Sequence, residues 1–163
     1  MEILWAPWRA TYIEKGEDEP GCLFCRVLAD PSSDGVNLVL WREPGALVML
    51  NKYPYNSGHL LVAPVRHTGD FAELQAEEVA DLTSALQRGV KLLEKVLTPD
   101  GFNLGANLGK AAGAGIADHL HFHAVPRWNG DTNFMPVVGD TKVINEHLET
   151  TAAKLRAALA TSQ

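Results

Sequence analysis

Apolar residues in much of the chain gather in short runs that end at turn-forming residues, a pattern typical of β-strands. The runs that we expect to form strands are 36–41, 46–50, 59–65, 102–107 and 119–125, with Pro126 ending the last. Between the second and third runs, residues 51–58 are rich in Pro, Asn and Gly, which predicts a connecting turn. Polar stretches at 14–21 and 29–35 predict loops.

Two segments carry the spacing of amphipathic helices instead. From about residue 72 to residue 97, leucines recur at intervals of four, seven or eight, with charged and amide residues between them. Pro99 and Gly101 predict the end of this helix. A second helical pattern runs from about 144 to 160. Successive strands, one long helix, two more strands and a C-terminal helix predict an α+β fold with a mainly antiparallel sheet.

The composition is that of an ordinary globular protein. A chain of 163 residues with 46% hydrophobic and 21% charged residues suits one compact domain and excludes wholesale disorder. A net charge of −6 argues against binding to nucleic acid backbones or to anionic lipid. The chain has no apolar run of transmembrane length, no signal-peptide pattern at its N-terminus and too few cysteines for a disulfide scaffold. We therefore expect no membrane association and a cytoplasmic location.

Three histidines stand at alternate positions near the end of the predicted sheet: His119, His121 and His123. Because alternate side chains of a strand share one face, the three imidazoles are expected to line one surface. A polar outer face or a patch of adventitious metal ligands are the ordinary alternatives. A functional site is favoured because imidazole can act as nucleophile, proton carrier or ligand near neutral pH.

A glycine-rich passage directly precedes these histidines. Gly109, Gly113 and Gly115 have no Cβ, so backbone N–H groups there can approach phosphate oxygens closely. Such donors would let an acidic protein bind an anion without positive side chains. Lys110 and Arg127 could add positive charge nearby, or be solvated. The alternative for the whole passage is a merely flexible connection between two strands.

The two cysteines, Cys22 and Cys25, have the two-residue gap of a zinc knuckle. A redox pair and two buried small side chains share this spacing. The redox interpretation is weaker because we expect the motif in a loop, with no helical pattern after it. A zinc site needs two further ligands, for which only histidines remain plausible.

The segment 119–125 (HLHFHAV) resembles the His-φ-His-φ-His-φ-φ signature of the histidine-triad (HIT) superfamily of nucleotidyl hydrolases and transferases. Further similar motifs follow the family's order at 50–54, 58–64 and 107–113. Residues 126–134 (PRWNGDTNF) look like the bacterial diadenosine tetraphosphate phosphorylase branch. The resemblance implies a single HIT domain over 1–163, with an N-terminal segment 1–35 that holds the predicted zinc knuckle and a catalytic core at about 36–150.

The resemblance also implies roles for individual residues. His121 would attack the α-phosphate of a nucleotide to form a nucleotidyl-imidazole intermediate, and His123 would bond a phosphate oxygen or the leaving group. Asn51 would contact the ribose hydroxyls, and Asn107 the ribose or a phosphate. Either asparagine could instead be a turn former at a strand end. Gly113 and Gly115 belong to the loop that would approach the phosphates.

For the metal, the resemblance supplies His67 and His119 as the partners of Cys22 and Cys25. Four protein ligands close a zinc tetrahedron, so this zinc would be structural rather than catalytic. Family members usually pair as homodimers, which we expect here too. His59 and His147 are interpreted as structural or surface residues.

One departure from the family bears on the reaction. Many members carry Gln-Ser or Gln-Thr where this chain has Ala114-Gly115-Ile116, which offers no side-chain donor. This disfavours hydrolysis of mononucleotide amides relative to phosphorolysis of dinucleotides. The resemblance therefore implies a nucleotidyltransferase that converts diadenosine tetraphosphate and inorganic phosphate to ATP and ADP. The alternatives are a hydrolase of dinucleoside polyphosphates or nucleoside phosphoramidates and a nucleotide-binding regulatory module.

Overall fold

The computed structural model describes residues 21–132, 144 and 146–161. Most of the predicted loop at 14–21, the last two residues of the motif at 126–134 and part of the predicted start of the terminal helix lie outside these residues. None of the helices in these ranges combines the length and apolar character needed to cross a membrane.

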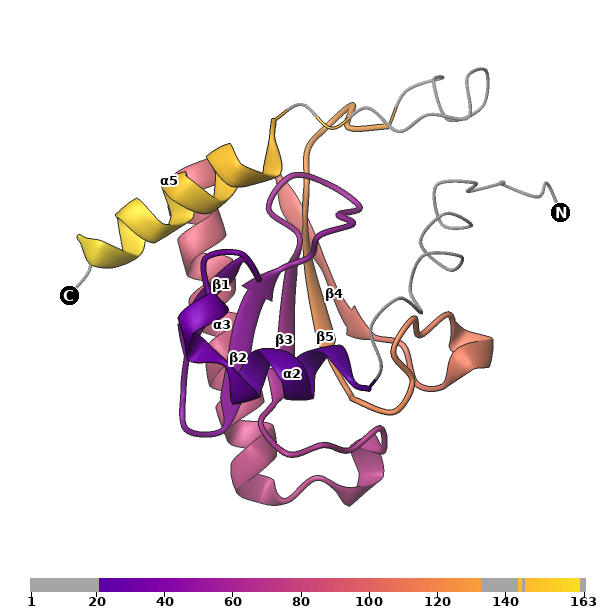
Figure 1. The fold of residues 1–163 in the computed structure, drawn as a ribbon. Coiled ribbons are helices and arrows are strands. Elements are labelled where there is room, and N and C mark those ends of the chain that lie inside the picture. The colour runs from indigo at the N-terminus through magenta and orange to yellow at the C-terminus, as the bar shows by residue number, and fades with distance from the viewer. Residues whose placement is uncertain (1–20, 133–143, 145, 162–163) are drawn as a thin grey trace, which may run out of the picture.

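A five-stranded antiparallel sheet forms the centre of the described structure, in the order β1-β2-β3-β5-β4 (Figure 1). The strands are β1 Val39–Arg42, β2 Ala46–Leu50, β3 Leu60–Pro64, β4 Gly101–Ala106 and β5 Phe122–Arg127. Each corresponds to one of the predicted apolar runs. The α+β prediction with an antiparallel sheet is confirmed.

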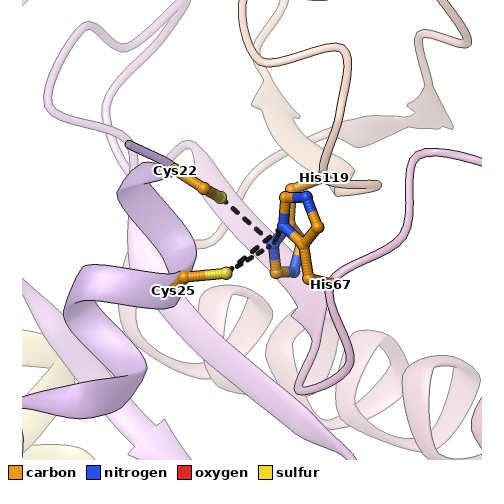
Figure 2. A group of neighbouring side chains, drawn as sticks. All are labelled: Cys22, Cys25, His67 and His119. Carbon is orange, nitrogen blue, oxygen red and sulfur yellow. Dashed lines mark hydrogen bonds between the residues drawn. The ribbon is translucent and has the colours of Figure 1, made fainter. Parts of the chain in front are cut away.

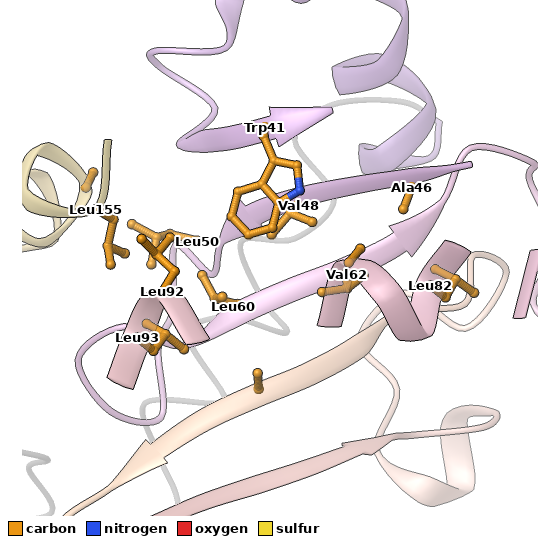
Figure 3. Packing of buried hydrophobic residues seen from close by; sticks show 13 residues of the cluster. Trp41, Ala46, Val48, Leu50, Leu60, Val62, Leu82, Leu92, Leu93 and Leu155 are labelled. Atoms are coloured by element: carbon orange, nitrogen blue, oxygen red, sulfur yellow. The ribbon is translucent and has the colours of Figure 1, made fainter. Parts of the chain in front are cut away.

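Helices cover both faces of this sheet. Helix α3 (Ala76–Leu97) crosses one face and α2 (Leu23–Ala29) the other, while α5 (Leu148–Ala160) packs beside α3 (Figure 1). The main core lies between the sheet, α3 and α5, where leucines such as Leu60, Leu93 and Leu155 are fully buried (Figure 3). A second apolar cluster around Phe24 lies under α2. Strands β2 and β3 are buried along their whole length because both of their faces are covered.

The long helix begins later than its leucine pattern predicts, after a short 3-10 turn at Phe71–Glu73. The Glu78 carboxylate accepts the backbone N–H of Gln75, which satisfies a donor that the first helical turn leaves without a partner. Glu78 also forms an ion pair with Arg66. The hydrogen bond from Arg66 is the main reason that the pKa of the Glu78 carboxyl falls to about 2. Because Arg66 adjoins His67, this contact anchors the helix start beside a predicted zinc ligand.

The interpretation of residues 22–25 as part of a loop is wrong. Cys22 is the N-cap of α2, and Cys25 lies within that helix. A helix of seven residues is too short for an apolar period to stand out in the sequence. Its Phe24 and Val27 are buried against the sheet, and this tertiary packing holds the helix in place.

The last strand is also shifted from its predicted position. It begins at Phe122 rather than at 119, and it continues through Pro126 to Arg127. Pro126 is tolerated because pairing with β3 ends at Ala124, so no N–H is needed on that side. His119 and His121 stand before the strand, where the Leu120 N–H donates to the carbonyl of Thr68. The chain there packs against the His67 loop instead of extending the sheet.

Candidate functional site

His121 is held in one protonation form by its own backbone neighbourhood. Its Nδ1 lies 2.9 Å from the carbonyl oxygen of His119. A carbonyl can only accept, so Nδ1 carries the hydrogen and the lone pair is on Nε2. The side chain is 6% exposed, and burial lowers the pKa of this imidazole. His121 is therefore a neutral ring with an available nucleophilic nitrogen.

The hydrogen bond from His59 determines which ring nitrogen of His123 carries the hydrogen. The backbone N–H of Tyr55 donates to Nδ1 of His59 at 3.1 Å, so the hydrogen of neutral His59 is on Nε2. That Nε2 lies 2.9 Å from Nδ1 of His123, which must accept. The hydrogen of neutral His123 is therefore on its own Nε2. With its ring centroid 5.0 Å from that of His121, His123 can donate a hydrogen bond beside the Nε2 lone pair of His121.

Of the two interpretations of His59, a surface residue is excluded and a structural role remains, which acts on His123. Its side chain is fully buried, and it sets the tautomer of a triad histidine. The available signal was a polar residue at the head of the otherwise apolar run 59–65, since an imidazole there needs a buried partner. The partner itself follows only from the sheet, where His123 stands opposite Leu61 on β3.

The two predicted nucleotide-binding asparagines occupy different surroundings. Asn51 follows β2, and its Nδ2 lies 3.3 Å from Nδ1 of His59, which places it beside the His59–His123 pair. Its Oδ1 accepts the backbone N–H of Tyr53. Asn107 lies after β4 and donates to the carbonyl of Gly113 at 3.5 Å. Asn51 is close to the triad, whereas Asn107 ties down the glycine loop.

The glycine loop is folded on itself. Residues 110–112 form a 3-10 turn, and Gly109 and Gly113 adopt positive φ values of 78° and 89°. The N–H groups of Ala112, Gly113 and Ala114 donate to carbonyls of the same loop. These three amides are engaged in this conformation, so only the other amides of 109–115 remain as candidate phosphate donors.

Arg127 does not direct its charge to a phosphate site. Its guanidinium makes two hydrogen bonds to Asp131, at 2.6 and 2.8 Å, and a third to Asn103. The Arg127 hydrogen bonds hold the pKa of the Asp131 carboxyl well below its usual range. Asp131 also accepts from the buried amide of Asn56. Asp131, in the segment after β5, thus joins the end of this strand to the turn at 51–58 through hydrogen bonds.

The second cluster joins Cys22 and Cys25 of α2 to His67 and His119 (Figure 2). One ligand atom from each residue lies within 4.8 Å of the others. Nδ1 of His119 is 3.2 Å from Sγ of Cys22, and Nδ1 of His67 is 3.3 Å from Sγ of Cys25. Nε2 of His119 donates to the carbonyl of Pro64 at 2.9 Å, so its Nδ1 lone pair points at the thiols. Two sulfurs and two imidazole nitrogens are the donor set of a structural zinc site, and the residues fit that metal.

His67 and His119 are brought together by an unusually close approach of two loops. A Cβ added at Gly69 would lie 2.4 Å from the carbonyl oxygen of Ala117, so only glycine fits there. His119 contacts both the cysteine pair and His121, because its imidazole faces Cys22 and its carbonyl accepts a hydrogen bond from His121. Phe24 of α2 lies against both rings, with centroids 5.0 and 5.1 Å away. The cluster of two cysteines and two histidines is therefore linked to His121 through His119 and Phe24.

Comparison with known proteins gives a consistent result. A model of the HIT domain matches residues 32–130. The AP-4-A phosphorylase of Mycobacterium tuberculosis (strain ATCC 25618 / H37Rv) is 38% identical over 157 residues, which cover 93% of this chain and 80% of that protein. The adenylylsulfatase HINT3 of Arabidopsis thaliana is 30% identical over 119 residues, covering 73% of this chain and 58% of that one. The crystal structure of a Zn-bound histidine triad family protein from Mycobacterium smegmatis is similar with a TM-score of 0.70 and 32% identity, covering 87% and 95% of the two chains.

Proposed function

The chain belongs to the HIT domain family, as its motifs indicated, and from that premise we propose that it transfers nucleotidyl groups from dinucleoside polyphosphates to inorganic phosphate. Diadenosine tetraphosphate would give ATP and ADP. The observation that carries the proposal is the pair of fixed tautomers, a lone pair on Nε2 of His121 beside a hydrogen on Nε2 of His123. The similarity to an AP-4-A phosphorylase supports the choice of substrate.

In the first step, Nε2 of His121 attacks the α-phosphorus and forms a P–N bond as the P–O bond to the departing ATP breaks. His123 donates a hydrogen bond from its Nε2–H to the oxygen on which charge develops, and it keeps that hydrogen because a neutral imidazole has no second proton to give. In the second step, an oxygen of inorganic phosphate attacks the same phosphorus. ADP forms and the neutral imidazole of His121 is restored.

Phosphate must compete with water for the intermediate. Water is present at about 55 M, so a phosphorylase has to bind and orient phosphate rather than meet it by diffusion. The small residues Ala114 and Gly115 leave room beside the loop where many relatives carry larger polar side chains. We assign the acceptor phosphate to this loop, through the amides that are not engaged within it.

Cleavage of diadenosine tetraphosphate should depend on phosphate and saturate with it. With ¹⁸O-labelled phosphate, the label should appear in ADP, and equal amounts of ATP should form. The same reaction in H₂¹⁸O without phosphate serves as the control and should be slow. Equal turnover there, with labelled AMP as product, would identify water as the acceptor and this chain as a hydrolase. That second candidate passes through the same intermediate, and the three engaged amides of the loop favour it.

A structural zinc on Cys22, Cys25, His67 and His119 is part of the proposal. When bound, the metal would cross-link α2 to the segment that carries the nucleophile, and four protein ligands leave no coordination position for substrate. The site needs reduced cysteines, which supports the expected cytoplasmic location.

We also propose that the chain forms a homodimer through β4. Among the described residues, no strand pairs with the outer edge of β4, which carries neither charge nor proline. Leu104 on this strand is 52% exposed, and Leu108 just after it is 50% exposed. An apolar hollow lined by Phe71, Val79 and Phe122 lies on the α3 side of the sheet, one strand in from this edge. A second copy would cover both features.

Leu104→Lys should therefore shift the protein from twice the chain mass to the chain mass in light scattering. A lysine on an edge strand opposes pairing with another edge. Val36→Lys is the matched control, because Val36 is 87% exposed and precedes β1, the strand at the opposite edge of the sheet from β4. A monomeric wild-type protein, or a Leu104→Lys variant that stays dimeric, would contradict the assignment.

A further inference from the structure

We propose that Tyr55 is a positioning residue that keeps His123 aimed at the substrate oxygen, an inference that rests on the proposed function. Tyr55 lies in the turn between β2 and β3, four residues before His59. It acts on the His59–His123 pair in two ways. Its backbone fixes where the hydrogens are, and its ring fixes where the imidazoles lie.

The backbone contribution is the N–H that donates to Nδ1 of His59 at 3.1 Å. The amide of Asn51 approaches the same nitrogen at 3.3 Å through Nδ2. Both groups can only donate, so a hydrogen on Nδ1 of His59 would oppose both of them. These hydrogen bonds are all satisfied when His59 carries its hydrogen on Nε2. His123 then also carries its hydrogen on Nε2.

The ring contribution is a stacked cover over both imidazoles. The Tyr55 ring lies 4.7 Å from the centroid of His59 at 27°, and 6.0 Å from that of His123 at 24°. The rings of His59 and His123 are themselves tilted by 42°, with centroids 5.1 Å apart. One near-parallel ring therefore spans both partners of the 2.9 Å hydrogen bond. It limits rotation of each imidazole and keeps water from competing for that bond.

The consequence concerns the hydrogen bond that His123 donates to the departing oxygen, not the binding of phosphate. If His59 turns, His123 loses the acceptor role of its Nδ1 and can carry its hydrogen on either nitrogen. Part of the population then presents a lone pair instead of an N–H to the departing oxygen. Departure of a basic oxygen should suffer, while departure of a stable anion should not, because the charge on that anion needs little stabilisation by a hydrogen bond.

The first test reads the tautomers directly and does not depend on catalysis. In imidazole ¹⁵N spectra of the wild-type protein, His59 and His123 should both show the Nε2–H form. Tyr55→Ala should give His123 averaged signals of the two tautomers, and Tyr55→Phe, which keeps the ring, should restore the wild-type pattern. A wild-type His59 with hydrogen on Nδ1, or a Tyr55→Ala spectrum identical to the wild type, would overturn the proposal. If Tyr55→Ala does not fold, Tyr55→Leu takes its place.

The second test compares two esters of adenosine 5′-monophosphate, one with phenol and one with 2,4-dinitrophenol. Phenoxide is strongly basic and depends on the hydrogen bond from His123 as it leaves, whereas dinitrophenolate does not. Tyr55→Ala should lower kcat for the phenyl ester roughly ten-fold, the effect of losing one hydrogen bond to a developing anion, with KM little changed. For the dinitrophenyl ester the loss should be less than about two-fold. Tyr55→Phe should behave like the wild type with both.

Tyr53→Ala is the control for loss of a tyrosine from the same turn, and its effect should be the same factor on both esters. Equal losses on the two esters in Tyr55→Ala would show a general structural role and overturn the proposal. If the wild-type protein released neither phenol, the proposed function would have failed instead. The ¹⁵N spectra would then still decide whether Tyr55 sets the tautomer.

Discussion

His121→Ala should lose nucleotidyl transfer by about three orders of magnitude or more while the protein keeps its fold and binds nucleotide. The variant has no Nε2 lone pair beside the α-phosphorus, and no other described ring is presented in this way. His119 directs its Nδ1 to the thiols, and Nδ1 of His123 accepts from His59. Neither can take over the attack without breaking a buried contact.

The measurement is kcat for diadenosine tetraphosphate with saturating phosphate, together with calorimetric binding of ADP. His147→Ala is the matched control, since His147 is exposed at the N-cap of α5 and lies outside the site. It should leave kcat and binding unchanged. One tenth of wild-type activity in His121→Ala would exclude His121 as the nucleophile. Loss of ADP binding together with activity would point to a collapsed site instead.

The sheet could be predicted from sequence because its strands are short apolar runs separated by strong turn formers. Strand β2 has the predicted bounds, and α3 ends at Leu97 as its leucine pattern indicates. The four predicted metal ligands came from the family resemblance and meet in space. The two-residue gap between Cys22 and Cys25 indicated these two as ligands. His67 lies 42 residues from Cys25, and nothing in the local sequence pattern links the two.

The parts that sequence did not predict are those that tertiary contacts decide. Alternation over 119–125 suggested one continuous strand, yet residues 119–121 pack against the His67 loop and pairing with β3 begins only at Phe122. The tautomers depend on single carbonyl and amide groups, which no residue pattern encodes. Likewise, the pairing of Arg127 with Asp131, four residues later, follows from the turn after β5.

The same reasoning explains why the two clusters should respond together. His119 takes part in two hydrogen bonds, because its Nε2 donates to the carbonyl of Pro64 and its own carbonyl accepts from Nδ1 of His121. A restraint on its ring therefore also restrains the carbonyl that holds His121. Metal binding at Cys22, Cys25, His67 and His119 would restrain that ring from α2 and from the His67 loop at once. Loss of metal is expected to lower stability directly. It should lower the catalytic rate only by loosening the placement of His121.

Cys22→Ser should abolish zinc binding and lower the melting temperature. Elemental analysis of the wild-type protein should find about one zinc per chain, and the variant should contain none. The apolar cores on both faces of the sheet remain, so the domain should stay folded. A loss of about 3–4 kcal/mol of stability corresponds to a fall of roughly 10 °C for a domain of this size. Metal-free wild-type protein of normal stability would defeat the zinc assignment.

Zinc added back separates the metal's contribution from that of the cysteine side chain. Wild-type protein stripped by a chelator should regain its melting temperature with zinc, whereas Cys22→Ser should not respond. Because four protein ligands would leave no open position, the stripped enzyme should retain KM and lose part of kcat through looser placement of His121 by the His119 carbonyl. A complete loss of kcat in stripped protein that stays folded would show instead that the metal takes part in the chemical step. A stripped protein with unchanged kcat would show that His119 holds His121 without help from the metal.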